Sequence, residues 1–239
     1  MSAAERAAEY LRGARRPDSP AGWTQKAQRD FVTEIDRTSE RLIADALLAR
    51  TPAARIVGEE LAPELVREGL VWVVDPLDGT TNFLHGIPAF AVSIAAVQDG
   101  RLEAAVVLDV PHRERFEAVR GGGATCNGAA IRVSRIEDPA FALVGTGFPF
   151  RDVGRLAEYQ RHFAAIDLAW VASGRYDGFW ELRLAPWDIA AGVLLVREAG
   201  GVATDLEGDP DVVRETGLVA GNPAMHAWLL EVVRPTGRA

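Results

Sequence analysis

The chain has 239 residues, of which 48% are hydrophobic and 25% charged, and this composition is typical of globular proteins with one large or two small domains. Its formal net charge of −8 argues against nucleic-acid binding through a basic surface. Neither a membrane-spanning apolar run nor the apolar core of a signal peptide is present, and the single cysteine has no partner for an internal disulfide. We therefore expect a cytoplasmic protein without membrane contact.

The N-terminal region predicts two helices joined by a loop. Residues 2–12 are rich in alanine and predict the first helix, and glycines bound a loop at 13–22. Residues 33–50 predict a long amphipathic helix with Asp36 in its first turn, where a carboxylate complements the helix dipole. The expected apolar face of this helix carries Ile35, Leu42, Ile43, Ala46 and Leu47.

Lys26 is the only lysine in a chain with many arginines, and it precedes the run from Asp30 to Asp36. Lysine is a compact point charge, whereas arginine is a wide planar fork. One hypothesis places Lys26 near a functional site, where it balances acidic groups. The alternative is an ordinary solvated lysine in a loop.

Residues 70–84 are the most informative stretch. Leu70–Val74 is an apolar, β-branched run that predicts a buried strand. We expect the strand to stop at Asp75, because Pro76 cannot donate to the sheet ladder. Residues 77–79 then predict a turn, and residues 80–82 predict the start of a helix.

Two carboxylates, Asp75 and Asp78, would thus stand close together at the end of a rigid strand. They would repel each other unless a cation lay between them. Oxygen ligands of this kind suit Mg²⁺, and backbone N–H groups at the start of a helix suit an anion. A lone Asp-x-x-Asp pair is more often a polar turn of two solvated acids than a metal site, so the prediction depends on the whole string.

The rest of the chain predicts short strands followed by an α/β region. Gly121-Gly122-Gly123 lacks the Lys-Ser/Thr and the helix of a P-loop, so we interpret it as a turn. Pro186-Trp187-Asp188 opens a helix that Gly200-Gly201 ends. The expected strands are 55–57, 90–97, 102–109, 115–119, 141–146, 178–184, 201–205 and 217–220, and the expected helices are 155–166, 167–174, 189–199 and 223–233.

The string Asp75–Phe83 resembles the first signature of the inositol monophosphatase family, which are Mg²⁺-dependent, lithium-sensitive phosphatases. Pro186–Gly192, followed by Glu198–Gly201, resembles a second signature of the family. Gly58–Glu60 and Asp30–Asp36 resemble two further elements, and all of them stand in the family's order. The likeness covers nearly the whole chain.

The resemblance implies a layered α-β-α-β-α sandwich of the inositol monophosphatase/fructose-1,6-bisphosphatase type, with two sheets and helices between and outside them. The chain would divide into an α+β half at residues 1–134, with the main metal motif, and an α/β half at residues 135–239, with Asp188. A homodimer is also implied.

The resemblance also assigns roles to individual residues, with two or three Mg²⁺ ions at each site. Glu59, Asp75 and the Leu77 carbonyl would hold one cation, and Asp75, Asp78 and Asp188 a second. Glu59 and Thr80 would orient the attacking water, and Asp36 would hold Thr80 in place. The remaining contacts, to the phosphate or to the rest of the substrate, would come from Gly79, Thr80, Thr81, Glu181 and Asp188.

The expected reaction is hydrolysis of a small phosphate monoester, with inositol monophosphate the leading substrate because Thr81-Asn82-Phe83 is similar to the inositol-type sequence. Fructose-1,6-bisphosphatase, histidinol-phosphatase and adenosine 3′,5′-bisphosphatase activities use the same ligands and remain alternatives. A different class of function is interaction with the transcription machinery, as for some bacterial relatives. Near Ile166 the sequence lacks a substrate-contacting stretch that relatives carry. Either the protein has lost this stretch or the printed sequence omits it, and both alternatives leave the substrate open.

Overall fold

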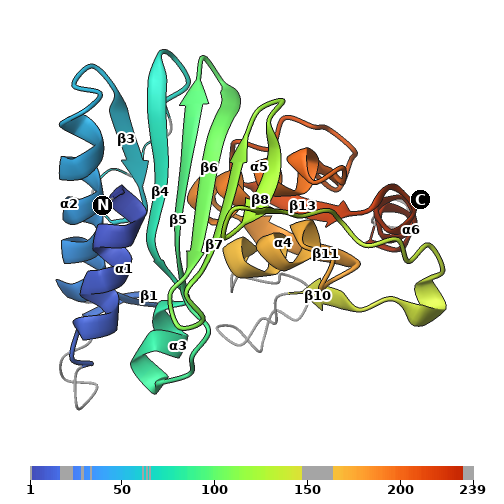
Figure 1. The fold of residues 1–239 in the computed structure, drawn as a ribbon, viewed down its shortest axis with the longest axis horizontal. Helices are drawn as coiled ribbons and strands as arrows, with labels where there is room; N and C mark the ends of the chain where they lie inside the picture. The colour runs from blue at the N-terminus through green and yellow to red at the C-terminus, as the bar shows by residue number, and fades with distance from the viewer. Residues whose placement is uncertain are drawn as a thin grey trace.

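A computed structural model describes residues 2–16, 24–27, 30–32, 34–60, 62, 64, 66–146 and 164–233, and for 24–27 and 30–32 it describes the backbone only. Five layers follow one another across the molecule: helices, sheet, helices, sheet and helix (Figure 1). The first outer layer contains α1 (Ala3–Gly13) and α2 (Glu34–Leu48), and the opposite outer layer contains α6 (Pro223–Val233). The central layer contains α4 (Ala164–Ala172) and α5 (Pro186–Glu198). This arrangement confirms the expected layered fold.

The larger sheet contains seven strands in spatial order β3 to β9. β3 pairs with β4 in parallel, and every later pair is antiparallel, so β5, β6 and β7 form the expected meander. The strands are β3 (Arg55–Gly58), β4 (Leu70–Asp78), β5 (Ala91–Gln98), β6 (Arg101–Asp109), β7 (Glu114–Val119), β8 (Gly123–Cys126) and β9 (Ala129–Ala130).

The smaller sheet has the order β10-β11-β13-β12 and lies between the central helices and α6. Its strands are β10 (Val144–Thr146), β11 (Gly178–Leu184), β12 (Val202–Thr204) and β13 (Thr216–Gly221). The chain also forms a ribbon of β1 (Thr24–Ala27) and β2 (Asp30–Val32), the short helix α3 (Thr80–His85) and a 3₁₀ turn, η2 (Pro139–Phe141). The proposed division of the chain at residue 134 stays a prediction.

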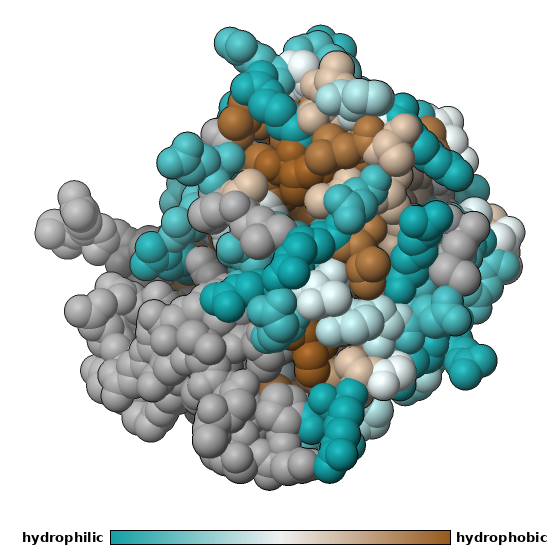
Figure 2. All heavy atoms as spheres, turned by 90° about the vertical axis from the view of Figure 1, so that its left-hand side faces the viewer, coloured by the Kyte–Doolittle hydropathy of each residue, from teal (hydrophilic) through white to brown (hydrophobic). Residues whose placement is uncertain are grey.

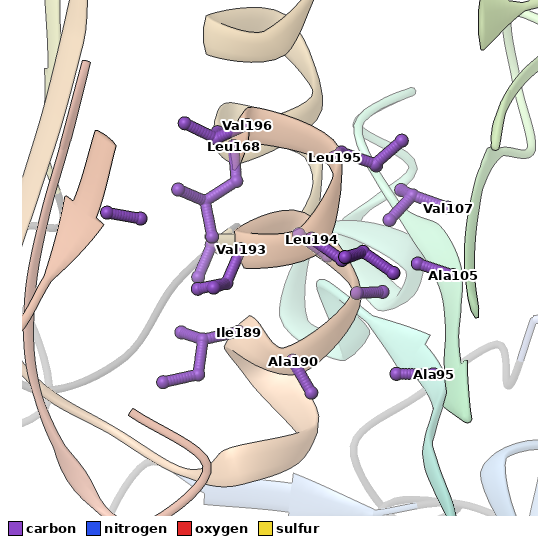
Figure 3. Packing of buried hydrophobic residues seen from close by; sticks show 14 of the residues in the cluster. Ala95, Ala105, Val107, Leu168, Ile189, Ala190, Val193, Leu194, Leu195 and Val196 are labelled. Carbon is purple, nitrogen blue, oxygen red and sulfur yellow. The ribbon is translucent and has the colours of Figure 1, made fainter. Parts of the chain in front are cut away.

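Helix α5 is the centre of the hydrophobic core. Every residue from Pro186 to Val196 is buried, and a helix that is apolar on all sides must be covered on all sides. Figure 3 shows Ala190 and Leu194 on the side of the larger sheet, where Ala105 of β6 lies, while Ile189 and Val193 point the other way. The two sheets therefore share one core through this helix.

The bounds of one expected strand and the break expected between two helices were wrong. The strand predicted at 141–146 is shorter, because Pro139 begins η2 and the Asp138 carboxylate accepts a hydrogen bond from the Ala140 N–H at 2.9 Å. The break expected between the helices at 155–166 and 167–174 is absent, because α4 runs through this point from Ala164 to Ala172 and buries most of its side chains there. Residues 147–163 lie outside the described part of the chain.

Strand β4 does not stop at Asp75, as the sequence had suggested. It continues to Asp78 with a shift of register, in which Asp75 pairs with Ser93 and Asp78 pairs with Ala91. From Asp75 to Asp78, β4 advances three residues while β5 advances only two, so β4 contains a β-bulge. Pro76 lies in this bulge, where no backbone N–H is needed for the sheet. The bulge turns the chain just where both carboxylates stand.

Among the described residues, every helix is too short or too polar to cross a lipid bilayer.

The close contact between α4 and α5 gives a stability prediction. A Cβ added at Gly192 would lie 2.5 Å from Leu168 Cβ, which is too short for any real contact. We expect Gly192→Ala to lower the free energy of unfolding by about 1–3 kcal/mol, although alanine favours helices more than glycine does. Gly13→Ala is the control, because nothing lies within 4 Å of its added Cβ. Denaturant unfolding that shows equal effects of the two substitutions would contradict this packing.

Candidate active site

The bulge of β4 orients the Asp75 carboxylate. The Leu77 N–H donates to Asp75 Oδ1 at 3.0 Å, so the carboxylate closes a short turn over Pro76. Asp75 is only 2% exposed, and Asp78, at the end of the same strand, is 7% exposed. Asp78 Oδ2 accepts a hydrogen bond from the Ala165 N–H of α4 at 3.2 Å. The strand and the central helix therefore meet at this pair of acids.

The buried face of α2 is polar, which corrects the apolar face expected from the sequence. Asp36, Ser39 and Glu40 are buried beside Ile43, whereas Leu42, Ala46 and Leu47 are only partly buried. These polar side chains make specific contacts with the segments that carry the acids. The Ser39 hydroxyl, for example, donates to the Pro76 carbonyl at 2.9 Å inside the bulge.

Asp36 and Thr80 are in direct contact, as the resemblance implied. Thr80 Oγ1 lies 2.8 Å from Asp36 Oδ1 and 3.0 Å from the Leu77 carbonyl, and the hydroxyl has one proton to donate. Thr80 is the first residue of α3, after Gly79 with a φ of 91°. That left-handed conformation suits glycine, and it turns the chain out of the strand and into the helix.

Glu40 is a residue that sequence reasoning missed. It is fully buried, and its Oε2 accepts a hydrogen bond from the Glu60 N–H at 2.9 Å. A Cβ on Gly58 would lie 2.2 Å from Glu40 Oε1, so the glycine is needed for this approach. Glu40 thereby fixes the turn that presents Glu59. The sequence signal that could have identified Glu40 is an acidic residue on the inner face of an otherwise amphipathic helix.

Asp188 enters the site from α5. It stands in the first turn of the helix, and its Oδ2 accepts a hydrogen bond from the Ala185 N–H at 2.7 Å. This back-contact to the residue before the helix sets the side-chain direction. The Trp187 carbonyl one residue earlier accepts a hydrogen bond from the Ser93 hydroxyl of β5 at 3.5 Å, which ties the helix start to the larger sheet.

The carboxylates act on one another electrostatically. Burial raises the pKa of Asp75 well above its ordinary value, and the charges of Glu59, Asp78 and Asp188 raise it further. Burial likewise raises the pKa of Asp78, with contributions from Asp188, Asp167 and Glu59. Four acids predicted from the sequence, in segments as distant as residues 59 and 188, are thus brought together.

Asp167 is a fifth acid of this cluster, and the sequence prediction did not assign it a role. It lies in the first turn of α4, and burial raises its pKa to about 7. Its charge acts on Asp78. The signal that could have found it is a single aspartate among the buried alanine, isoleucine and leucine residues of this helix.

The remaining predicted contacts are more scattered. Thr81 Oγ1 is buried and has no hydrogen-bond partner in the described part of the chain, so it is available to a bound group. Glu181 is fully buried on β11 in the smaller sheet. The Asn82 side chain donates to the Ala89 carbonyl at 2.9 Å and so holds the loop after α3. Lys26 is on β1, where only the backbone is described, and its role stays a prediction.

The acid cluster fits a hard cation by its chemistry. Among the described residues, no three acidic, imidazole or thiol groups already stand together as a complete metal-ligand set. Every ligand candidate is nevertheless a carboxylate or carbonyl oxygen, which Mg²⁺ prefers. Buried carboxylates with raised pKa values also gain from a nearby positive charge. The fit therefore depends on donor type and electrostatics.

The five-layer fold, with a cluster of acids where its central helices meet the larger sheet, defines a class of layered α/β phosphatases. The model of the inositol monophosphatase family matches residues 1–237, and the chain belongs to this family.

Two relatives and one solved structure show how close the likeness is. The chain is 48% identical over 231 residues to the protein named Nus factor SuhB of Pseudomonas aeruginosa, with 88% of this chain and 85% of the relative covered. It is 42% identical over 225 residues to the inositol-1-monophosphatase of Rhizobium meliloti, with 87% and 85% covered. The crystal structure of the extragenic suppressor protein suhB from Bartonella henselae matches with a TM-score of 0.86 and 37% identity, over 98% of this chain and 96% of that one.

The alignments also bear on the expected missing stretch. The alignment with the Pseudomonas aeruginosa relative is 231 positions long, but it covers only 88% of the 239 residues of this chain. The alignment is therefore longer than the covered part of this chain, so at some positions the relative has a residue and this chain has a gap. Relatives therefore carry internal residues that this chain lacks. That these fall near Ile166 stays a prediction.

Asp167 gives a prediction about pH. Because the folded state binds this proton more tightly than the unfolded chain does, the free energy of unfolding falls as pH rises from near 3.8 to about 7. In metal-free protein, Asp167→Asn should therefore raise stability by on the order of 1–3 kcal/mol at pH 8, and by less at pH 5.

Thermal unfolding in the presence of a chelator measures this difference. Asp45→Asn, on the exposed face of α2, is the matched control and should change stability little at either pH. If Asp167→Asn had the same effect at pH 5 and at pH 8, the raised pKa of Asp167 would not be the cause.

Proposed function

We propose that the protein hydrolyses small phosphate monoesters with Mg²⁺ as cofactor. The observation that carries the proposal is the electrostatic coupling of Glu59, Asp75, Asp78 and Asp188, which arrive from three separate parts of the fold. The match to the inositol monophosphatase family supports it. A cluster of buried, mutually repelling acids costs stability, and cation binding offers a reason for its presence.

The proposed roles follow the residue chemistry. Glu59, Asp75 and the Leu77 carbonyl would hold one cation, and Asp75, Asp78 and Asp188 would hold a second, with two or three ions in all. When bound, Mg²⁺ supplies positive charge that lowers the pKa of water and stabilises the oxygen that leaves phosphorus.

The protein's own groups position the reactants. When Thr80 donates its proton to Asp36, its lone pairs remain free to accept a hydrogen bond from the attacking water. Glu59 accepts the other proton of that water. The N–H groups of Gly79, Thr80 and Thr81, with the unpartnered Thr81 hydroxyl, contact the phosphate oxygens.

We propose inositol monophosphate as the leading substrate, with its hydroxyl groups contacting Glu181 and Asp188. The relative from Rhizobium meliloti, named inositol-1-monophosphatase, supports this assignment. Fructose-1,6-bisphosphatase, histidinol-phosphatase and adenosine 3′,5′-bisphosphatase activities remain alternatives at the same acids. Localisation in the cytoplasm and a homodimer also stay predictions.

A second candidate function is interaction with the transcription machinery. The relative from Pseudomonas aeruginosa is named Nus factor SuhB and is 48% identical to this chain, which favours a similar role here. Both functions can coexist, because the acid cluster occupies a small part of the molecule. Co-purification of the chain with transcription factors, compared between wild type and Asp75→Asn, tests whether such an interaction is independent of the acids.

Phosphate release from inositol 1-phosphate tests the proposed reaction, with fructose 1,6-bisphosphate and histidinol phosphate in parallel. We expect release that requires Mg²⁺ and is fastest on inositol 1-phosphate. Asp75→Asn should lower kcat by at least about 100-fold, because it weakens both proposed cation sites. Asp45→Asn, which removes an exposed acid of α2, should leave kcat unchanged.

The outcomes separate the parts of the proposal. Faster phosphate release from another substrate would be consistent with the proposed roles of the acids but would change the substrate assignment. Near-normal turnover by Asp75→Asn would contradict the proposed roles of the acids. Folded protein that releases phosphate from none of these substrates would favour the interaction function.

A further inference from the structure

The outer face of the larger sheet carries a groove whose lining includes none of the clustered acids. The two helices of the first layer leave part of this face uncovered, between the first turns of α1 and the last turn of α2. The cavity there has a volume of about 430 Å³, within the range of small-molecule sites. We call it the α1–α2 groove, and it is lined chiefly by Ala46, Leu47, Trp72, Ile94, Ala104 and Val106, with Arg6 and Arg50 at its rim.

Small side chains in the lining leave the cavity open, and larger side chains form its walls. Ala46 and Ala104 contribute no more than a methyl group each, while Trp72 and Ile94 reach the same cavity from β4 and β5. The Trp72 indole N–H donates to Thr51 Oγ1 at 3.0 Å, so the wall is anchored beneath the end of α2. Figure 2 shows apolar side chains gathered on this face, with hydrophilic residues around them.

The rim of the groove is positively charged. Within the described residues, the guanidinium groups of Arg6 and Arg50 have no hydrogen-bond or ion-pair partner, and both are exposed. The acid that also lines the groove, Glu117, is paired with Arg115 at 3.1 Å. An apolar floor beside two unpaired cations is complementary to a molecule with a hydrocarbon body and one anionic group.

We propose that the α1–α2 groove binds a medium-chain carboxylate, with its hydrocarbon on the alanine-lined floor and its carboxylate paired with the two rim arginines. The size of the groove favours a small molecule over a protein. A stable protein interface buries at least about 1,000 Å², and the surface around the groove is hydrophilic. The same argument disfavours a second copy of this chain.

This site is independent of the proposed phosphatase. Neighbouring residues of a strand face opposite sides of the sheet, so Trp72 faces α1 and α2 while Val73 and Asp75 face the central helices. Variants of the groove should therefore leave phosphate release unchanged. Loss of ligand binding and loss of catalysis can thus be told apart.

Isothermal titration calorimetry with dodecanoate below its micelle concentration tests the proposal. We expect one saturable site in each chain. Dodecyltrimethylammonium, which has the same hydrocarbon and the opposite charge, and butanoate, which has the charge without the hydrocarbon, should each bind at least tenfold more weakly.

Three variants locate the site on the molecule. Arg50→Glu should weaken dodecanoate binding at least tenfold, whereas Arg132→Glu, an exposed arginine away from the groove, should leave it unchanged. Ala104→Phe fills the cavity and should abolish binding, while unchanged phosphate release and melting temperature show that the variant is folded.

Undiminished binding to Ala104→Phe, or equal binding of the cationic detergent, would overturn the proposal. So would self-association of the wild-type chain that Ala104→Phe removes, since a second copy would then occupy the groove.

Discussion

The mutual repulsion of buried carboxylates is the constraint on which the site depends. Asp75 and Asp78 have raised pKa values because burial and neighbouring acids both oppose their ionisation. A fold that places like charges together must hold them in position by other contacts. The structure shows those contacts from β4, α4, α5 and α2.

Three of the carboxylates accept a hydrogen bond from a backbone N–H group. The Leu77, Ala165 and Ala185 N–H groups donate to Asp75, Asp78 and Asp188 in turn. From the outside, the polar face of α2 supports the bulge through Ser39 and the turn before Glu59 through Glu40. The buried polar residues of α2 therefore serve the site more than they serve the core.

The elements with strong local signals could be predicted from the sequence. The meander of β5–β7 follows from alternating apolar runs and turns, and α5 follows from a proline at its start and glycines after its end. Asp75 and Asp78 could be proposed from the residues themselves, as two carboxylates at the end of a buried strand. The layered fold and the role of Asp188 came from the resemblance to a family, because short acidic motifs alone do not define a fold.

Features that depend on distant partners could not be predicted. The continuation of β4 past Pro76 requires pairing with Ala91 of β5, and the burial of Glu40 requires the Glu60 N–H twenty residues later. The position of Asp167 beside Asp78 joins segments eighty-nine residues apart. A local pattern can single out Glu40 or Asp167 as an unusual acid, but it does not identify the distant partner. The same holds for the α1–α2 groove, which exists only when both helices pack on the sheet.

The most direct test of the central claim, that these acids form a cation site, is the melting temperature of the chain as Mg²⁺ is titrated at pH 8. Ionic strength should be held constant with NaCl. The account predicts a saturable rise of about 5–10 °C at ~100 times Kd, because a cation that binds only the folded state relieves the repulsion. An equal melting temperature in Mg²⁺ and in matched NaCl would contradict it.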